Sequence, residues 1–375
     1  MSTLFQQLPS LAKAFGKPIT TTPQPAVILA EGAFQTPRAK VAHGLVRGTS
    51  RFDIRAVVDS TCSGSDAGML LDCRPTGVHV VADLDGARAL ATGHRRPAAI
   101  LGVAPHGGRL DPGLHTLIVQ TLRHGFDIVS GLHDFLCDDP VIAPLAARLG
   151  ATLTDVRKPP SDRPLRYWTG EVTDLRATRI AVLGTDCMVG KRTTSRLLVA
   201  ALREAGTSAE MIHTGQTGWM QGSRYGIVLD SIPCDFVAGE IEGAMLACAA
   251  EADPDIMVLE GQSGLRNPAG SGAGSRGIMI AGDSHAVVLQ HSPARKYFDG
   301  LEDRGFRIPD IADEVSLLER FDRPVVAVTI NTQGMEPGSI DTECARLEER
   351  LGRPVVAPFE HGLSRLVEIV RNIGA

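Results

Sequence analysis

The segment from Gly184 to Thr194 has the residue types and the spacing of a phosphate-binding loop. It follows the apolar run TRIAVL and opens the helical pattern RTTSRLLVAALREA. A glycine turn between a strand and a helix exposes backbone N–H groups at the positive end of the helix dipole, and a lysine adds a positive charge. We therefore expect a phosphate cradle rather than a merely tight turn. Its predicted residues are Gly184, Thr185, Asp186, Val189, Gly190, Lys191, Arg192, Thr193 and Thr194.

Two details distinguish this loop from the usual nucleotide-binding motif. Five residues, not four, separate Gly184 from Gly190, and Arg192 stands where the usual motif has the Ser or Thr that binds Mg²⁺. Thr193 lies one residue further, roughly 100° around the helix, so it replaces that ligand only if the first turn is rotated. The sequence thus favours phosphate binding and disfavours magnesium-dependent phosphoryl transfer.

Two strand ends carry candidates for a general base. The apolar run DIMVL is followed by Glu260 and then by a glycine, which predicts a carboxylate at the carboxyl edge of a buried strand. We expect Glu260 in a base or electrostatic role, against the alternative that it caps a neighbouring helix. His285 is the second candidate because its ordinary pKa suits neutral pH, and we expect Asp283 and His285 at the same sheet edge as Glu260. If neither Glu260 nor His285 is the base, Asp66 and His106 come next.

Arginines in glycine-rich loops could hold the carboxylates of a substrate, because a guanidinium binds a carboxylate through two parallel hydrogen bonds. Arg224, Arg266 and Arg276 lie in such loops, and each could equally be a solvated surface residue. Arg266 comes shortly after the run LEGQSG and is therefore the best single candidate. Gln216, which follows the run AEMIHTG, is the second predicted substrate-binding residue.

Short apolar runs separated by amphipathic stretches must position these residues. Continuous Val, Ile and Leu runs that alternate with helical patterns predict parallel sheets covered on both faces. The fold class is therefore α/β, with a Rossmann-like domain over 20–160 and a P-loop NTPase-like doubly wound domain over 161–375. The Pro-rich, charged stretch 157–172 joins them. The runs lie at 25–31, 54–60, 98–105, 126–132, 178–184, 209–215, 255–261, 285–292, 323–331 and 353–359.

Composition excludes several classes of protein. The chain of 375 residues has a net charge of −5 and no basic block, which disfavours nucleic acid as a partner. Seven cysteines without a C-x-x-C pair argue for reduced thiols, and with no H-E-x-x-H we expect no bound metal. No apolar run is long enough for a membrane span and no secretory signal opens the chain, so we expect a cytoplasmic protein. We expect small-molecule substrates and a homo-oligomer. No G-x-G-x-x-G follows the first strand, so a dinucleotide dehydrogenase is poorly supported.

The run GTDCMVGKRTT resembles the longer P-loop of dethiobiotin synthetase, G-T-D-T-x-V-G-K-T, and LEGQSG is similar to the acidic strand end of that enzyme. With GVAPHGG and SGLHDFL added, roughly residues 25–340 resemble a two-domain family that was long catalogued as a domain of unknown function. That family includes D-glutamate N-acetyltransferases of D-amino-acid catabolism. The resemblance implies acetyl-CoA as co-substrate and the amino group of D-glutamate as acceptor.

The resemblance and the loop agree on an anchoring role for the phosphate site. Coenzyme A carries a pyrophosphate and a 3′-phosphate, so a P-loop with an extra arginine can hold a donor that is never cleaved at phosphorus. The alternative is an ATP-dependent ligase or kinase of the dethiobiotin synthetase type, in which Asp186, Thr193 and Glu260 hold Mg²⁺. A third possibility, a nucleotide-sensing regulator, has the least support because the sequence shows no DNA-binding or interaction tail.

Overall fold

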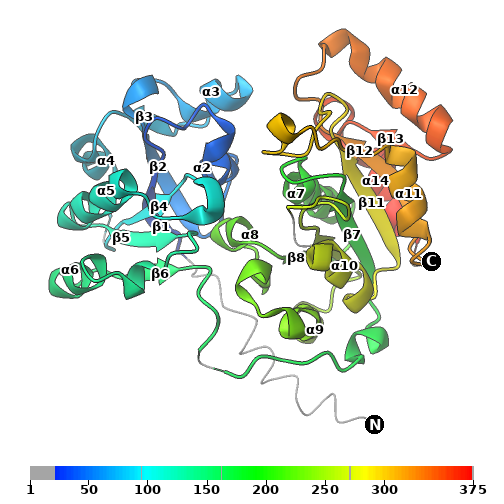
Figure 1. Ribbon diagram of the computed structural model, residues 1–375, viewed down its shortest axis with the longest axis horizontal. Coiled ribbons are helices and arrows are strands. Elements are labelled where there is room, and N and C mark those ends of the chain that lie inside the picture. Colours follow the sequence, from blue (N-terminus) through cyan, green and yellow to red (C-terminus); the bar gives the residue numbers. More distant parts are fainter. Residues whose placement is uncertain (1–21, 94, 162, 270–271, 374–375) are drawn as a thin grey trace. The chain divides into compact units, whose positions relative to one another are not determined.

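Two parallel sheets, one for each half of the sequence, organise the computed structural model, which describes residues 22–93, 95–161, 163–269 and 272–373 (Figure 1). They belong to two compact units. The Rossmann-like unit holds the described residues up to Pro159 and also the segment Gln216–Ser223. The P-loop unit holds Pro160–Gly215 and the described residues from Arg224 onward. The predicted α/β class with two parallel-sheet domains is confirmed.

The sheet of the Rossmann-like unit has six strands in the order β3-β2-β1-β4-β5-β6, and all its pairs are parallel. This is the strand order of Rossmann dinucleotide-binding folds, in which the order reverses between β1 and β4. The strands are β1 (Gln24–Leu29), β2 (Phe52–Val58), β3 (His79–Val81), β4 (Ala98–Leu101), β5 (Asp127–Ser130) and β6 (Leu153–Asp155).

Helices cover both faces of this sheet, as its alternating side chains require. Val27 and Leu29 face a core formed with α4, α5 and α6, whereas Ala26 and Ile28 face a core formed with α2 and α3. Met220 of α8 joins the second of these cores, although it lies far along the sequence. The helices are α2 (Lys40–Val46), α3 (Ala67–Asp72), α4 (Leu84–Leu90), α5 (Pro112–Arg123), α6 (Ile142–Leu149) and α8 (Gln216–Met220).

The sheet of the P-loop unit has seven parallel strands in the order β13-β12-β11-β7-β10-β8-β9. Every apolar run named above contains a strand, and the short strands β3, β6 and β9 were not predicted. The strands are β7 (Thr178–Gly184), β8 (Ala209–His213), β9 (Tyr225–Gly226), β10 (Ile256–Glu260), β11 (Ala286–His291), β12 (Val325–Ile330) and β13 (Val355–Val356).

Both faces of the second sheet are also buried. Ala181 and Leu183 pack against α9, α10, α11 and α12, whereas Ile180 and Val182 pack against α7 and α14. The helices are α7 (Lys191–Glu204), α9 (Cys234–Ala252), α10 (Gly272–Ala281), α11 (Ile311–Glu319), α12 (Ile340–Leu351), α13 (Pro358–His361) and α14 (Ser364–Arg371).

The predicted connecting stretch is attached to α9 by buried carboxylates. Glu240 accepts hydrogen bonds from both terminal nitrogens of Arg163, at 2.8 and 2.5 Å, and from the backbone N–H of Arg166 at 2.8 Å. Glu242 accepts from the N–H and the hydroxyl of Thr169, at 2.8 and 2.9 Å. Because both glutamates are fully buried, these bonds compensate for their loss of hydration and fix the start of the P-loop unit.

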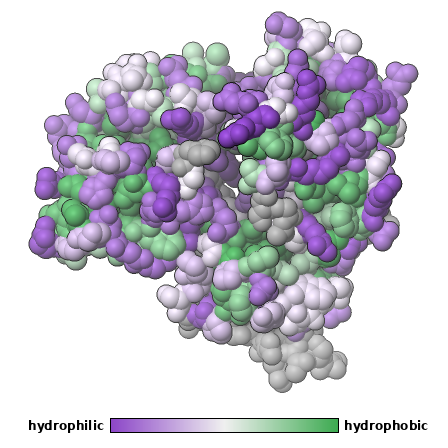
Figure 2. Space-filling model, viewed as in Figure 1, coloured by the Kyte–Doolittle hydropathy of each residue, from purple (hydrophilic) through white to green (hydrophobic). Residues whose placement is uncertain are grey.

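Figure 2 shows hydrophilic side chains spread over the visible faces of both units, with apolar side chains between them. Within the described ranges, no helix combines the length and the apolar character needed to cross a membrane.

Candidate functional site

The predicted phosphate loop connects β7 to α7, as its sequence indicates. Gly190 precedes the helix with a φ of +112°, a left-handed conformation that L side chains rarely adopt, and Lys191 is the first helical residue. The Lys191 ammonium donates a hydrogen bond to the carbonyl oxygen of Asp186 at 2.5 Å, so the side chain folds back over the loop. Lys191 is 7% exposed, and burial lowers its pKa to about 8. The loop thus combines a helix N-terminus with a positive charge that is poorly hydrated.

Strands β10 and β11 flank β7 and bring their own carboxyl ends to the same edge. Glu260 pairs with Val182 and Gln290 with Gly184, and the N–H of Thr185 donates to the carbonyl of Gln290 at 3.1 Å. The loop after β10 approaches very closely, since a Cβ at Gly264 would lie 2.5 Å from the carbonyl oxygen of Thr185. Glycine is therefore required there for contact between backbones.

The carboxylate of Asp186 connects the phosphate loop to the loops beside it. Its carboxylate is fully buried and accepts hydrogen bonds from the Asn267 amide at 2.6 Å, the backbone N–H of Asp299 at 2.8 Å and the Arg295 guanidinium at 3.1 Å. These three partners belong to loops that follow β10 and β11. The expectation that Asp186 binds a cofactor or Mg²⁺ directly therefore conflicts with its contacts, because its oxygens already serve protein donors.

Thr194 also bonds to the protein. Its hydroxyl donates to the Gln290 side chain at 2.6 Å, and the same oxygen accepts from the Thr329 hydroxyl at 2.6 Å. The hydroxyl of Thr194, a predicted cradle residue, therefore has a protein partner inside the core. Thr193 is half-buried on the first turn of α7. In the described part of the chain, no three His, Cys, Asp or Glu side chains are grouped as metal ligands.

Glu260 lies beside the cations of α7. Its carboxylate accepts a hydrogen bond from the N–H of Thr214 at 3.2 Å and interacts electrostatically with Arg192, Lys191 and Arg196. Burial raises the pKa of Glu260, and the three cations oppose this change. The predicted position at the carboxyl edge is therefore found, and the Glu260 carboxylate lies among three basic side chains of α7.

His285 lies at the opposite edge of the sheet, which corrects the expectation that it shares an edge with Glu260. It precedes β11, and its N–H donates to the carbonyl of Arg179 at 2.8 Å, near the start of β7. Its Nδ1 accepts from the N–H of Arg179 at 3.0 Å. Asp283, predicted at the same edge, pairs with Arg179 at 2.7 Å. At about 3.3 Å per residue, Arg179 and the end of β7 at Gly184 are roughly 16 Å apart.

His291, at the carboxyl end of β11, is the histidine that reaches the loop. Its Nδ1 lies 3.1 Å from the Thr185 hydroxyl, and burial lowers its pKa to about 4. The ring is therefore neutral at pH 7. The sequence signal was present, because a residue that ends an apolar run lies at the carboxyl edge, whereas His285 begins that run.

The two predicted substrate-binding residues have protein neighbours outside the phosphate loop. Arg266 donates from Nε to the buried carboxylate of Glu314 at 2.7 Å, which joins the loop after β10 to α11. This ion pair occupies the Nε of the guanidinium that was expected to bind a substrate carboxylate. Gln216 begins α8 and packs within the Rossmann-like unit, where Gly131 is a neighbour. Lys191 and Gln216 thus belong to different units.

Of the other candidates, Arg224 and Asp66 have structural partners. Arg224 forms an ion pair with Glu251, and Arg276 is exposed on α10. Asp66 caps α3 by accepting from the N–H of Met69 at 3.0 Å. The side chain of His106 lies outside the described part of the structure.

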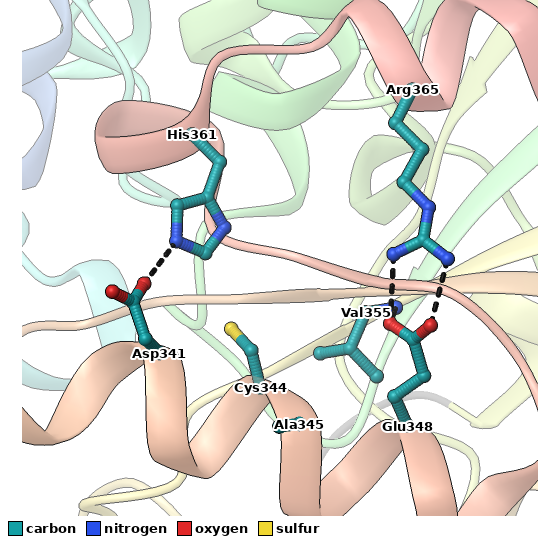
Figure 3. Close-up of a pocket in the computed structure, with 7 residues that line it drawn as sticks. All are labelled: Asp341, Cys344, Ala345, Glu348, Val355, His361 and Arg365. Carbon is teal, nitrogen blue, oxygen red and sulfur yellow. Dashed lines mark hydrogen bonds and ion pairs between the residues drawn. The ribbon is translucent and has the colours of Figure 1, made fainter.

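A pocket of about 370 Å³ lies between α12 and the segment from β13 to α14 (Figure 3). Its charged side chains pair with each other: His361 with Asp341 at 2.8 Å, and Arg365 with Glu348 at 2.7 Å. Because none of its lining residues belongs to the phosphate loop, this pocket is separate from the candidate site.

Fold and site together define a two-domain α/β protein in which a Rossmann-like domain precedes a P-loop domain. Models of the DUF1611 family match both parts: a domain of unknown function described as a Rossmann-like domain over residues 60–159, and one described as a P-loop domain over residues 166–367. The chain belongs to the DUF1611 family. The family resemblance inferred from the sequence is therefore confirmed.

Named relatives and a solved structure agree with this family assignment. A D-glutamate N-acetyltransferase from Tritonibacter scottomollicae is 33% identical over 281 residues, which cover 73% of this chain and 81% of the relative. Another from Pseudoalteromonas sp. is 31% identical over 273 residues, covering 72% and 79%. The crystal structure of a DUF1611 family protein from Anabaena variabilis superposes with a TM-score of 0.83 at 25% identity, over 93% of this chain and 99% of that chain. The names of the two enzymes support an N-acetyltransferase role here.

Proposed function

We propose that this protein transfers the acetyl group of acetyl-CoA to the amino group of an acidic amino acid, with D-glutamate as the first candidate. The names of its two enzyme relatives support the reaction and the acceptor. The observation that carries the proposal is the state of the phosphate loop. Lys191 and the helix N-terminus form an anion site, while the carboxylate of Asp186, one of the three residues that would hold Mg²⁺ in the alternative, bonds to protein groups.

This arrangement suits a donor that is held by its phosphates and reacts elsewhere. Acyl transfer breaks a carbon–sulfur bond, so the phosphates of coenzyme A need only binding and charge neutralisation. Lys191 supplies a charge from a buried position, where it is screened less than at the surface. Arg192, on the first turn of α7, can add a planar guanidinium for a second phosphate oxygen.

The acceptor requires a base, because the amino group of a free amino acid is protonated at neutral pH. Glu260 is our candidate, since burial raises the pKa of its carboxyl and the side chain lies at the edge where α/β sheets bind ligands. Its position among Arg192, Lys191 and Arg196 also serves a second role, in which it orients these cations. Replacing Glu260 by Gln should lower kcat/KM by roughly 10²–10⁴-fold and remove the acidic limb of its pH profile if the residue is the base.

The reaction is tested by offering both chemistries to the purified protein. Acetyl-CoA with D-glutamate, L-glutamate or D-aspartate, and separately ATP with Mg²⁺, are incubated and the products are identified by mass spectrometry. We expect N-acetyl-D-glutamate and free coenzyme A in equal amounts, and turnover that survives EDTA. Loss of activity on chelation that Mg²⁺ restores, or consumption of ATP without acetyl transfer, would instead support a ligase or kinase.

A further inference from the structure

A loop from outside the phosphate-binding motif places a second cation on it. Residues 292–300, which follow β11, carry Arg295 and Asp299. The Nη1 of Arg295 donates to the Asp186 carboxylate at 3.1 Å and to the carbonyl oxygen of Cys187 at 2.7 Å. The backbone N–H of Asp299 donates to the same carboxylate at 2.8 Å. The arginine is therefore fixed to the phosphate loop at two points by one of its nitrogens.

The Nε–Nη2 edge of this guanidinium is available to a ligand. Among the described residues, Nε and Nη2 of Arg295 make no hydrogen bond, and the side chain is 23% exposed. These two nitrogens form the planar fork with which arginine binds a phosphate or carboxylate through two parallel bonds. An arginine that is anchored by one nitrogen and offers this fork has lost much of its rotational freedom before a ligand arrives, which favours binding.

Charge at the loop is consistent with an anion site. Lys191 and Arg295 are close enough to interact, since the arginine contributes to lowering the pKa of the lysine. Asp186 offsets one positive charge and holds Arg295 in place, while Asn267 holds the other carboxylate oxygen at 2.6 Å. Four cations surround the loop, Lys191, Arg192, Arg196 and Arg295, against the two buried acids Asp186 and Glu260. They leave a net positive charge beside the helix N-terminus, where an anion adds favourably.

We infer that Arg295 is a donor-binding residue that contacts a phosphate of the acyl donor through its Nε–Nη2 edge, and that Asp186 is the positioning residue that holds it there. This inference rests on the proposed function and extends it by naming a residue outside the P-loop motif. The sequence alone does not indicate Arg295, because its contact with Asp186 spans more than a hundred residues.

The test compares Arg295→Lys with Arg365→Lys as the matched control. Arg365 is a surface arginine that pairs with Glu348, away from the loop, so its replacement leaves the donor site intact. A lysine at 295 keeps the charge and can still reach Asp186, but it cannot form the fork. Binding of acetyl-CoA is measured by titration calorimetry, KM for D-glutamate by product formation, and folding by thermal melting.

We expect Arg295→Lys to raise the Kd of acetyl-CoA about tenfold or more, to leave KM for D-glutamate within about twofold, and to melt like the control. Asp186→Asn should raise the same Kd. Combining it with Arg295→Lys should raise the Kd little further, because the two residues act as one unit. Unchanged acetyl-CoA binding in Arg295→Lys overturns the inference. A higher KM for D-glutamate with unchanged donor binding overturns it too, because the fork would then hold the acceptor.

Loss of the Arg295 role and loss of the proposed function give different binding results. If the parent protein binds acetyl-CoA and Lys191→Ala weakens that binding, but Arg295→Lys does not, then only the role of Arg295 is lost. If the parent protein does not bind acetyl-CoA at all, the proposed function itself is wrong. Competition by inorganic pyrophosphate in the parent protein supports phosphate recognition at the loop.

Discussion

At the scale of single residues, the buried ammonium of Lys191 has the clearest physical consequence. Burial lowers its pKa to about 8, from an ordinary value of 10.5. Between pH 8 and pH 10.5, Lys191 holds its proton in the unfolded chain but loses it in the folded protein. The free energy of unfolding therefore rises with pH across this window. The gap corresponds to about 3 kcal/mol that the charged lysine costs the folded state near pH 7.

Replacing Lys191 by Met removes this cost and should show the pH dependence directly. We expect the stability of Lys191→Met relative to the parent to be highest near pH 7 and to decrease by up to about 3 kcal/mol as pH rises from 8 to 10.5. Urea unfolding of both proteins at matched pH values gives this difference. A difference that stays constant over this range would show that the lysine is not buried as a cation.

Residue types alone identified the phosphate loop but not the partners of its side chains. Gly190 and Lys191 were predictable because their roles depend on neighbours in the sequence, a strand before and a helix after. The roles of Asp186, Thr194 and Arg266 depend on Arg295, Gln290 and Glu314, which other strands and helices bring near. Such pairs are set by tertiary packing, which a local pattern does not contain.

At the scale of elements, the apolar runs predicted the strands correctly, whereas the direction of the chain explains why His285 was misplaced. Every long apolar run became a strand, because four to seven apolar residues are enough to show a buried strand pattern. Strands β3, β6 and β9, of three, three and two residues, lie in no apolar run long enough to show a period. His285 was misplaced because it precedes its strand, and in a parallel sheet only residues that follow a strand reach the carboxyl edge.

The close approach of two loops gives a prediction at this scale. A methyl group at position 264 would lie 2.5 Å from the carbonyl oxygen of Thr185, a contact that backbone atoms cannot relieve without moving. We expect Gly264→Ala to fold and to bind acetyl-CoA about tenfold or more weakly, because the phosphate loop is displaced. The control is Gly338→Ala, whose added methyl group meets nothing within 4 Å. Equal donor affinity in the two variants would contradict the role given to this contact.

At the scale of the whole molecule, the two units are linked by more than the connecting stretch. The chain leaves the P-loop unit after Gly215, contributes Gln216–Ser223 to the Rossmann-like unit, and returns at Arg224. The segment 216–223 makes specific contacts within the Rossmann-like unit. The Gln221 amide donates to the carbonyl of Gly44 at 2.5 Å, and Arg51 lies 4.0 Å above the Trp219 ring. Composition gave no sign of it, since α8 lies in the middle of the P-loop sequence.

Because the segment 216–223 packs in the Rossmann-like unit, a substitution in this segment should destabilise that unit rather than the P-loop unit. Met220 is fully buried in the core of the Rossmann-like unit, so Met220→Ala should cost about 2–5 kcal/mol there. Hydrogen exchange should accelerate at the amides of β1 and leave those of β7 unchanged. Met245→Ala, in the core of the P-loop unit, should give the reverse pattern. Faster exchange only in β7 for Met220→Ala would show that the excursion does not stabilise the Rossmann-like unit.

Equilibrium binding of acetyl-CoA to Lys191→Ala tests whether the phosphate loop anchors the acyl donor. Lys296→Ala is the control, because Lys296 is an exposed lysine of the neighbouring loop. We expect the parent and the control to bind acetyl-CoA alike and Lys191→Ala to lose about 2–5 kcal/mol of binding free energy while remaining folded, since the donor phosphates then lack a desolvated partner. If Lys191→Ala binds acetyl-CoA as tightly as the parent, the loop does not hold the donor and the account is wrong.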